Sequence, residues 1–125
     1  MSSRPQFSPQ PVIVNGDLSG NITSKVTIIQ KLSQVSFDIA WSGASSPNGT
    51  LAVQVSNTYV QNQDGTVKTA GNWQTLTLSA TPTISGASGN GFIDIDATGA
   101  YAIRLIWTAV SGTGTLNATV NAKVA

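Results

Sequence analysis

Apolar and polar residues alternate strictly along much of this chain, and that alternation restricts it to β-structure. Four segments, residues 35–41, 51–55, 101–107 and 116–124, carry an apolar residue at every second position. Successive side chains of a strand point to opposite faces of a sheet, so each segment predicts an antiparallel strand with one buried face. The residues predicted to face the core are Val35, Phe37, Ile39, Trp41, Leu51, Val53, Val55, Tyr101, Ile103, Leu105, Trp107, Leu116, Ala118, Val120, Ala122 and Val124.

Shorter apolar runs extend the count to about eight strands; they cover residues 12–14, 26–28, 76–78 and 93–95. Thr, Val, Ile, Ser, Asn and Gly dominate throughout, so no window favours a helix of useful length. The chain is therefore predicted to be all-β, an antiparallel β-sandwich whose two sheets bury these faces against each other. Eight strands in two Greek keys favour the jelly-roll type. An immunoglobulin-like sandwich is the alternative, although the chain has no Cys for the Cys–Trp–Cys pattern of that fold.

Turn-forming dipeptides punctuate the strands. Three pairs of the Asn-Gly or Asp-Gly type, at residues 15–16, 48–49 and 64–65, tolerate the positive φ angles of tight turns, and a fourth at 90–91 leads into a predicted strand. The Ser-Gly-Thr-Gly sequence at 111–114 is expected to join the last two strands as a hairpin.

The first eleven residues contain three prolines and are expected to form an extended N-terminal arm, with residues 12–125 as a single domain. One interpretation is a frayed terminus, which is the usual behaviour of chain ends. The other is an arm that reaches onto a neighbouring subunit, anchored by its aromatic residue. The contact residues of such an arm would be Arg4, Pro5, Phe7 and Pro9.

Charged residues make up only 9% of the chain, and the net charge is +1. Proteins that bind nucleic acid need clustered Lys and Arg to displace counterions, and basic membrane patches need the same. The six basic residues here are scattered and nearly cancelled by five Asp, so neither nucleic acid nor a membrane is an expected partner. The sequence shows neither an apolar run long enough to span a membrane nor a signal peptide.

The chain contains no His, no Glu and no Cys. This inventory rules out Ser-His and Cys-His nucleophiles, imidazole or thiolate metal sites and Glu-based acid–base pairs. We therefore expect neither an enzyme nor a bound cofactor.

Asp94 and Asp96 are the one close acidic pair in the sequence. Two positions apart on a strand, their carboxylates would share one face at roughly 6.5–7 Å. Such a pair could supply oxygen ligands to a calcium ion. The simpler interpretation is that Ile93 and Ile95 face the core and both carboxylates face water.

Among the Trp and Tyr residues, two fall outside the alternating segments and are candidates for an exposed binding surface. Tyr59 and Trp73 flank the segment 60–72, whereas Trp41, Tyr101 and Trp107 are expected to pack in the core. Exposed aromatic rings can stack on sugars, and neighbouring carboxamides can hydrogen-bond the sugar hydroxyls. The proposed hydrogen-bonding residues are Asn57, Asn62, Gln63 and Asn72.

About 110 residues of the chain resemble small virion proteins of tailed bacteriophages. The matching runs are GDLS (16–19), ITS (22–24), WSG (41–43), GTLAVQVSN (49–57), GNWQTLTL (71–78), FIDI (92–95) and SGTGTLNA (111–118). The resemblance implies a protein of the virion, associated with the capsid or the tail, such as a decoration (cement) or head-fibre subunit. Its partners would then be other virion proteins.

Two hypotheses about function follow. The first is a non-enzymatic structural virion protein that packs against copies of itself, because interfaces are depleted in Lys, Glu and Asp and this chain has few of them. Closed symmetric homo-oligomers are common, so a trimer or ring is the expected working state. The second hypothesis is a carbohydrate-binding module that recognises cell-surface glycans, as many jelly-roll proteins do.

Overall fold

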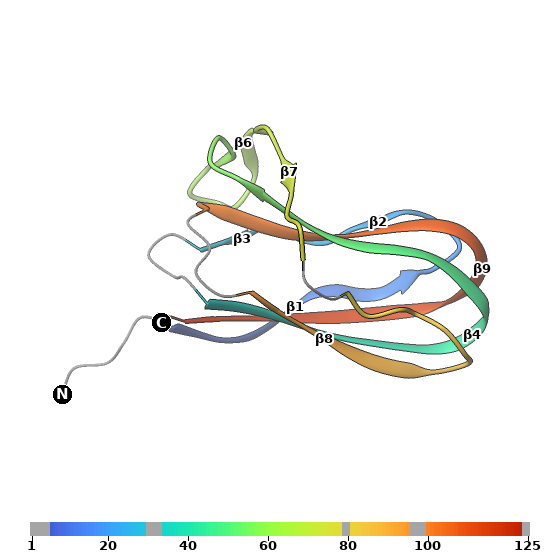
Figure 1. Ribbon diagram of the computed structural model, residues 1–125. Coiled ribbons are helices and arrows are strands. Elements are labelled where there is room, and N and C mark those ends of the chain that lie inside the picture. Colours follow the sequence, from blue (N-terminus) through green and yellow to red (C-terminus); the bar gives the residue numbers. More distant parts are fainter. Residues whose placement is uncertain (1–5, 30–33, 79–80, 96–99, 124–125) are drawn as a thin grey trace.

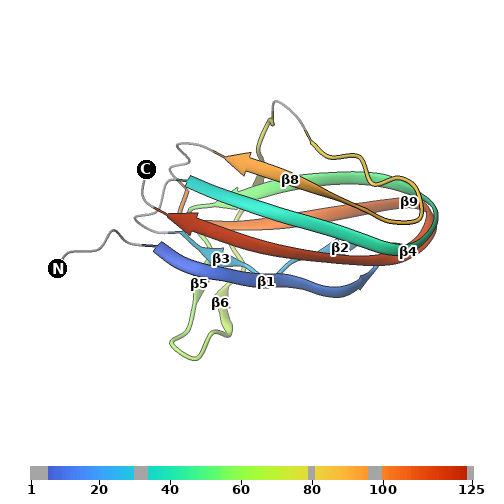
Figure 2. The same cartoon turned by 90° about the horizontal axis from the view of Figure 1, so that it is seen from below.

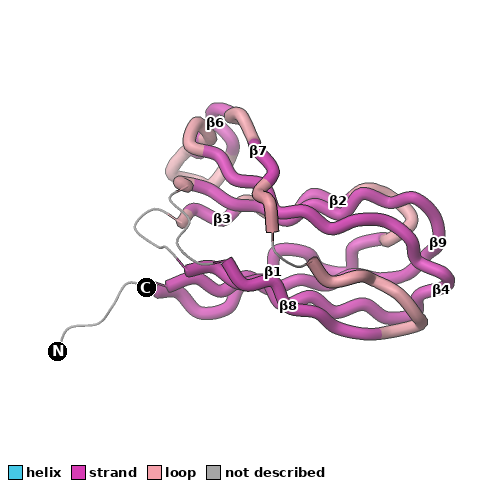
Figure 3. The backbone as a smooth tube through the Cα atoms, viewed as in Figure 1, coloured by secondary structure: helices cyan, strands magenta, loops and turns pink. Residues whose placement is uncertain are grey.

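The described part of the chain is built of strands and loops, without a helix (Figure 3). The computed structural model describes residues 6–29, 34–78, 81–95 and 100–123. Within those ranges, no helix has the length and apolar character needed to cross a membrane. The strands are β1 (Gln6–Asp17), β2 (Ile22–Thr23), β3 (Thr27–Ile28), β4 (Gln34–Ser56), β5 (Val60–Gln61), β6 (Val67–Thr69), β7 (Gln74–Thr75), β8 (Gly89–Ile95) and β9 (Ala102–Lys123). The predicted all-β fold is confirmed.

Two long strands, β4 and β9, organise the whole molecule. They contain 23 and 22 residues and pair antiparallel along their full length, from Gln34 opposite Lys123 to Ser56 opposite Ala102. This two-stranded ribbon folds over midway, where the pairing register shifts between Ser42 and Gly49 (Figure 1). Each long strand therefore contributes one half to each of two layers.

Every other strand of the sandwich pairs with one half of this ribbon. In layer one, β8 pairs with residues 35–41 of β4, and β1 pairs with residues 115–123 of β9 (Figure 2). In layer two, β7 pairs with the 49–56 half of β4, while β2 and β3 pair with the 102–109 half of β9. Only the β5–β6 hairpin stands apart among the described strands, projecting from layer two.

The alternating residues form the core between the layers. Phe37, Ile39, Leu105, Trp107 and Leu116 are almost completely buried, as their positions in the alternation predict. Full burial of an apolar side chain of this size contributes roughly 1.5–3 kcal/mol. The indole N–H groups of the core tryptophans are also satisfied, since Trp41 donates to the Ser85 carbonyl and Trp107 to the Leu18 carbonyl. Tyr101 and Val55 are half-buried at one end of the core, and Val124 lies outside the described residues.

The expected hairpin at 111–114 is wrong. This segment is the bend that carries β9 from one layer to the other, so the strands on either side of it face each other across the core instead of pairing. Gly112 has a φ of +90°, and a Cβ there would collide with the Ser46 carbonyl on the facing strand. A Gly-rich sequence such as Ser-Gly-Thr-Gly can form either a hairpin turn or a bulged bend. The long-range pairing of β9 with β4 determines which of the two forms here.

The three pairs predicted to form turns, at residues 15–16, 48–49 and 64–65, form different backbone features. Asp64-Gly65 closes the β5–β6 hairpin, with Gly65 at a φ of +91°. Asn15-Gly16 instead forms a bulge within β1, where the backbone N–H of Asn15 donates to the Asn117 side chain at 2.8 Å. Asn48-Gly49 belongs to the ribbon bend.

The predicted N-terminal arm needs a correction. Residues 6–11 are extended, as expected, but they belong to β1 and pair with β9 of the same chain, with Phe7 opposite Ala122. The edge position explains the prolines: Pro9 and Pro11 lack an N–H and are tolerated on an edge strand, where register shifts interrupt the ladder. Arg4 and Pro5 lie outside the described residues.

We predict that Gly112→Ala lowers the free energy of unfolding by at least about 2 kcal/mol, because the left-handed φ costs roughly 1–2 kcal/mol for a residue with a Cβ and the collision with Ser46 adds to it. Urea unfolding followed by fluorescence measures the change. Gly65→Ala is the matched control, since Gly65 has almost the same φ but open space around its Cβ position. Equal losses in the two variants would show that the bend is not sterically restricted.

Candidate functional site

The acidic pair does not gather further ligands in the described structure. Asp94 lies exposed on β8, opposite Ser36 of β4, and Asp96 falls outside the described residues. Within the described ranges, no three His, Cys, Asp or Glu side chains lie close enough together to hold a metal ion.

The structure brings together two of the residues predicted to hydrogen-bond a sugar, Asn57 and Asn72, at one end of layer two. Asn62 and Gln63 lie instead in the turn of the β5–β6 hairpin, outside the cleft lining. Asn57 and Asn72 line a cleft of about 270 Å³ together with Thr58 and Gln74. Its rim is fixed by hydrogen bonds: the Asn57 side chain accepts from the Tyr101 backbone at 2.8 Å, and the Thr58 hydroxyl accepts from the Asn72 backbone at 2.6 Å. The cleft lining is neutral and rich in carboxamides, which suits a small hydroxyl-bearing ligand.

Tyr59 does not offer the open ring that the sequence suggested. It is only 5% exposed and packs against Trp73, with ring centroids 5.6 Å apart and planes tilted by 58°. Gly71 permits this packing, because a Cβ there would collide with the Tyr59 backbone. Tyr59 therefore anchors the base of the β5–β6 hairpin, and Trp73 is the half-exposed member of the pair.

Arg104 completes this cluster and was missed by the sequence analysis. Its guanidinium carbon lies 4.1 Å from the centre of the Trp73 ring, and its Nε and Nη2 atoms both donate to Gln54 Oε1, at 2.9 and 2.8 Å. Burial lowers the pKa of Arg104 from its usual value, and no carboxylate opposes that shift. The alternation already placed residue 104 on an outer face, but nothing in the sequence pairs it with Gln54 or Trp73.

The hairpin tip beside this cluster is closed by local hydrogen bonds. Asp64 Oδ1 accepts from the backbone N–H of Thr66 at 3.0 Å and from its hydroxyl at 2.6 Å. These bonds, the hydroxyl's first, hold the pKa of Asp64 below its usual value. The hairpin nevertheless exposes Val60 and Val67 to solvent, so its base contacts are what fix its position.

A second surface is the outer face of layer one, seen in Figure 2. Its central strands carry small side chains, and two apolar residues stand exposed towards its edges: Phe92 on β8 at 61% and Val14 on β1 at 62%. The centre of this face is flat because the side chains on β4 and β9 there are short. The described residues of the face are Val14, Ser36, Asp38, Ala40, Asn90, Phe92, Asp94, Asn117, Thr119 and Asn121.

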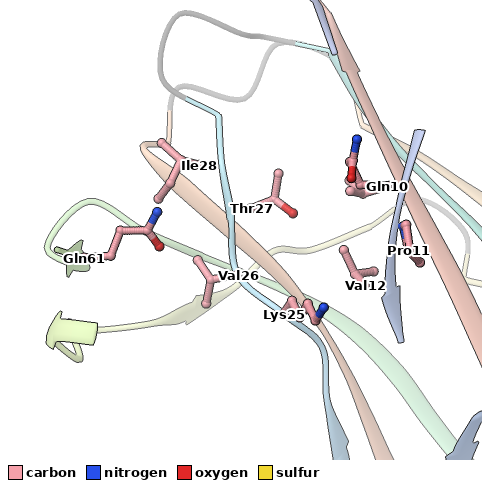
Figure 4. A pocket seen from close by; sticks show the side chains of 9 residues that line it. Gln10, Pro11, Val12, Lys25, Val26, Thr27, Ile28 and Gln61 are labelled. Atoms are coloured by element: carbon pink, nitrogen blue, oxygen red, sulfur yellow. The ribbon is translucent and has the colours of Figure 1, made fainter. Parts of the chain in front are cut away.

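A groove of about 390 Å³ lies on the open side of the sandwich, between β1 and residues 25–28 (Figure 4). Val12, Val26 and Ile28 contribute its apolar lining, and Lys25 bridges the layers by donating its backbone N–H to the Val12 carbonyl at 3.0 Å. Lys25 is the one charged residue among the described residues that line this groove.

We predict that Trp73→Ala loosens the β5–β6 hairpin without unfolding the sandwich. The substitution removes the packing on Tyr59, the cation–π contact with Arg104 and the indole hydrogen bond to the Ala70 carbonyl. Limited trypsin digestion should then cleave after Lys68 at least about tenfold faster, the effect of losing roughly 1.4 kcal/mol of local stability. Trp73→Phe keeps an aromatic ring, so its cleavage rate should lie between those of the wild type and Trp73→Ala. An unchanged cleavage rate in Trp73→Ala would contradict the anchoring role.

Comparison of the chain with protein-family models, with curated proteins and with solved structures gave no match.

Proposed function

We propose that this chain is a non-enzymatic structural subunit that self-associates through the outer face of layer one. The observation that carries the proposal is the exposure of Phe92, 61% accessible on a flat face of small side chains. Interface cores are enriched in aromatic residues. A ring that becomes fully buried in a contact commonly contributes a large share of its binding energy.

The dimensions of the face indicate how strong one contact would be. Four strands spaced about 4.8 Å apart and seven residues long span roughly 20 by 23 Å. A face of this size covers about 460 Å² on each partner, which is below the roughly 1,200–2,000 Å² total of stable interfaces and in the range of weak, transient contacts. One pair of subunits would then bind weakly, and repetition of the contact in an assembly would provide the strength.

We further propose that the assembly is a virus particle, in which the chain is a decoration or head-fibre subunit. This part of the proposal depends on the resemblance of runs such as residues 49–57 and 71–78 to phage virion proteins. The chain has few charged residues and no His, Glu or Cys. This composition is compatible with a structural role, because subunit packing depends on complementary surfaces and does not require a nucleophile or an acid–base pair.

We also infer that the sandwich is a jelly roll. If the separate β5–β6 hairpin is left out, β2 and β3 count as one strand, and β4 and β9 count as two each, the described strands of the two layers number eight in chain order. Layer one then has the order 1-8-3-6 and layer two the order 2-7-4-5. That alternation of early and late strands is expected when an antiparallel ribbon folds over into two Greek keys, which supports the inference.

We predict that Phe92→Ser weakens self-association at least about tenfold, the loss expected for an aromatic residue that contributes more than about 1.4 kcal/mol to an interface. Sedimentation equilibrium at concentrations up to about 1 mM, the weak limit of specific binding, measures it. Val110→Ser is the matched control, because Val110 is 70% exposed but lies at the bend, away from this face. A wild-type protein that stays monomeric throughout, or a control that weakens equally, would contradict the proposal.

A second candidate function is glycan binding at the cleft of Asn57 and Asn72. Its support is the convergence of three carboxamides, those of Asn57, Asn72 and Gln74, beside the half-exposed Trp73. The cleft is smaller than the roughly 300–1,000 Å³ pockets of drug-sized ligands, so its ligand would be of monosaccharide size. If the cleft binds a sugar, Asn72→Ala should abolish the glycan-array signal of the wild type, while Asn62→Ala, on the hairpin, should leave it unchanged. A wild-type protein that binds no glycan would eliminate this candidate.

A further inference from the structure

We propose that Arg104 is a carboxylate-binding site, and that its ligands are Asp38 and Asp94 of a second copy of this chain. The inference rests on the proposed self-association and names the surface that meets the outer face of layer one. That counterpart is the outer face of layer two, where Arg104 lies.

Arg104 is already held in a binding geometry. Two of the five N–H donors of a guanidinium go to Gln54 Oε1, at 2.9 and 2.8 Å, which leaves three. Trp73 supports the same group at 4.1 Å from its ring centre. A planar guanidinium that is fixed on one side by neutral partners loses little rotamer entropy when a carboxylate pairs with its remaining donors.

The charge of Arg104 has no counter-ion among the described carboxylates. Asp17 and Asp64 accept hydrogen bonds within their own turns, from Ser19 and Thr66. Asp38 on β4 and Asp94 on β8 are exposed residues of layer one. Figure 1 shows that the strands of this layer lie on the opposite side of the sandwich from layer two. A partly buried cation with only neutral neighbours is stabilised when an anion binds to it.

The acidic partner has a matching arrangement. Asp38 lies opposite Phe92 in the β4–β8 register, and Asp94 lies two positions further along β8, so the carboxylates are diagonal neighbours roughly 7–8 Å apart. A surface that combines an exposed ring with two carboxylates complements one that combines Arg104 with Ile106 and Ala52. Two acidic faces in contact with each other would instead place like charges together.

The contact would be heterologous, because the two faces lie on opposite sides of one sandwich. A head-to-tail contact of this type generates a ring if its rotation closes and a filament if it does not. Each subunit would then lie between two others, one at each layer.

The test is a charge swap between two proteins, Arg104→Glu and the double variant Asp38→Lys/Asp94→Lys. Each alone should associate at least about tenfold more weakly than wild type, because one pairing becomes repulsive. An equimolar mixture should regain association as alternating copies, since Lys meets Glu at one interface and Asp meets Arg at the next. Lys68→Glu, a reversal on the exposed hairpin, is the control and should behave as wild type. Thermal unfolding of each variant checks that the fold is retained.

The assignment is supported if each charge variant associates weakly by itself and association recovers when the two variants are mixed. If wild type associates and neither charge variant weakens it, or if the mixture does not recover, the Arg104 assignment is overturned while the proposed self-association stands. A monomeric wild type would overturn both proposals. If glucuronate, a carboxylate from outside the protein, perturbs Trp73 fluorescence in that monomer, the ligand of Arg104 is a sugar acid and not a second copy.

Discussion

The antiparallel pairing of β4 with β9 is the interaction on which the rest of the structure depends. It runs from Gln34–Lys123 to Ser56–Ala102, and every other strand of the two layers attaches to one of these two strands. Because both strands cross the bend together, their inward side chains meet in one core, where Phe37 and Trp107 are almost fully buried. A half-buried bend glycine such as Gly112 is therefore important for the fold, since the bend in which it lies fixes how the two layers are placed relative to each other.

Alternation was sufficient to predict the fold class and most of the core. Phe37, Leu105 and Val120 are buried as the alternation predicts. A period of two residues can be recognised within a short stretch of sequence, without knowledge of the pairing partners. The continuity of β4 and β9 could not be predicted in the same way. Gly112 tolerates a hairpin and a bulged bend equally well, and the choice depends on pairings between residues some 70 positions apart.

The candidate site shows the same division between local and long-range information. Asn57, Asn72 and Trp73 do cluster, because the segments that carry them meet at one end of layer two. The burial of Tyr59 and the position of Arg104 over Trp73 depend on how the β5–β6 hairpin folds back, which no local pattern records. Phe92 was overlooked for a simpler reason: an outward aromatic residue is conspicuous only after the inward face of β8 is known.

We propose that the two outer faces of the sandwich bind each other between copies of the chain. Concentration-dependent NMR chemical shifts of the wild-type protein test this contact, because they locate it without altering a residue. If the faces bind each other, the shifts on raising the concentration should concentrate at Asp38, Phe92 and Asp94 on one face and at Gln54 and Arg104 on the other. Shifts confined to a single face, or centred on the groove between β1 and residues 25–28, would contradict it.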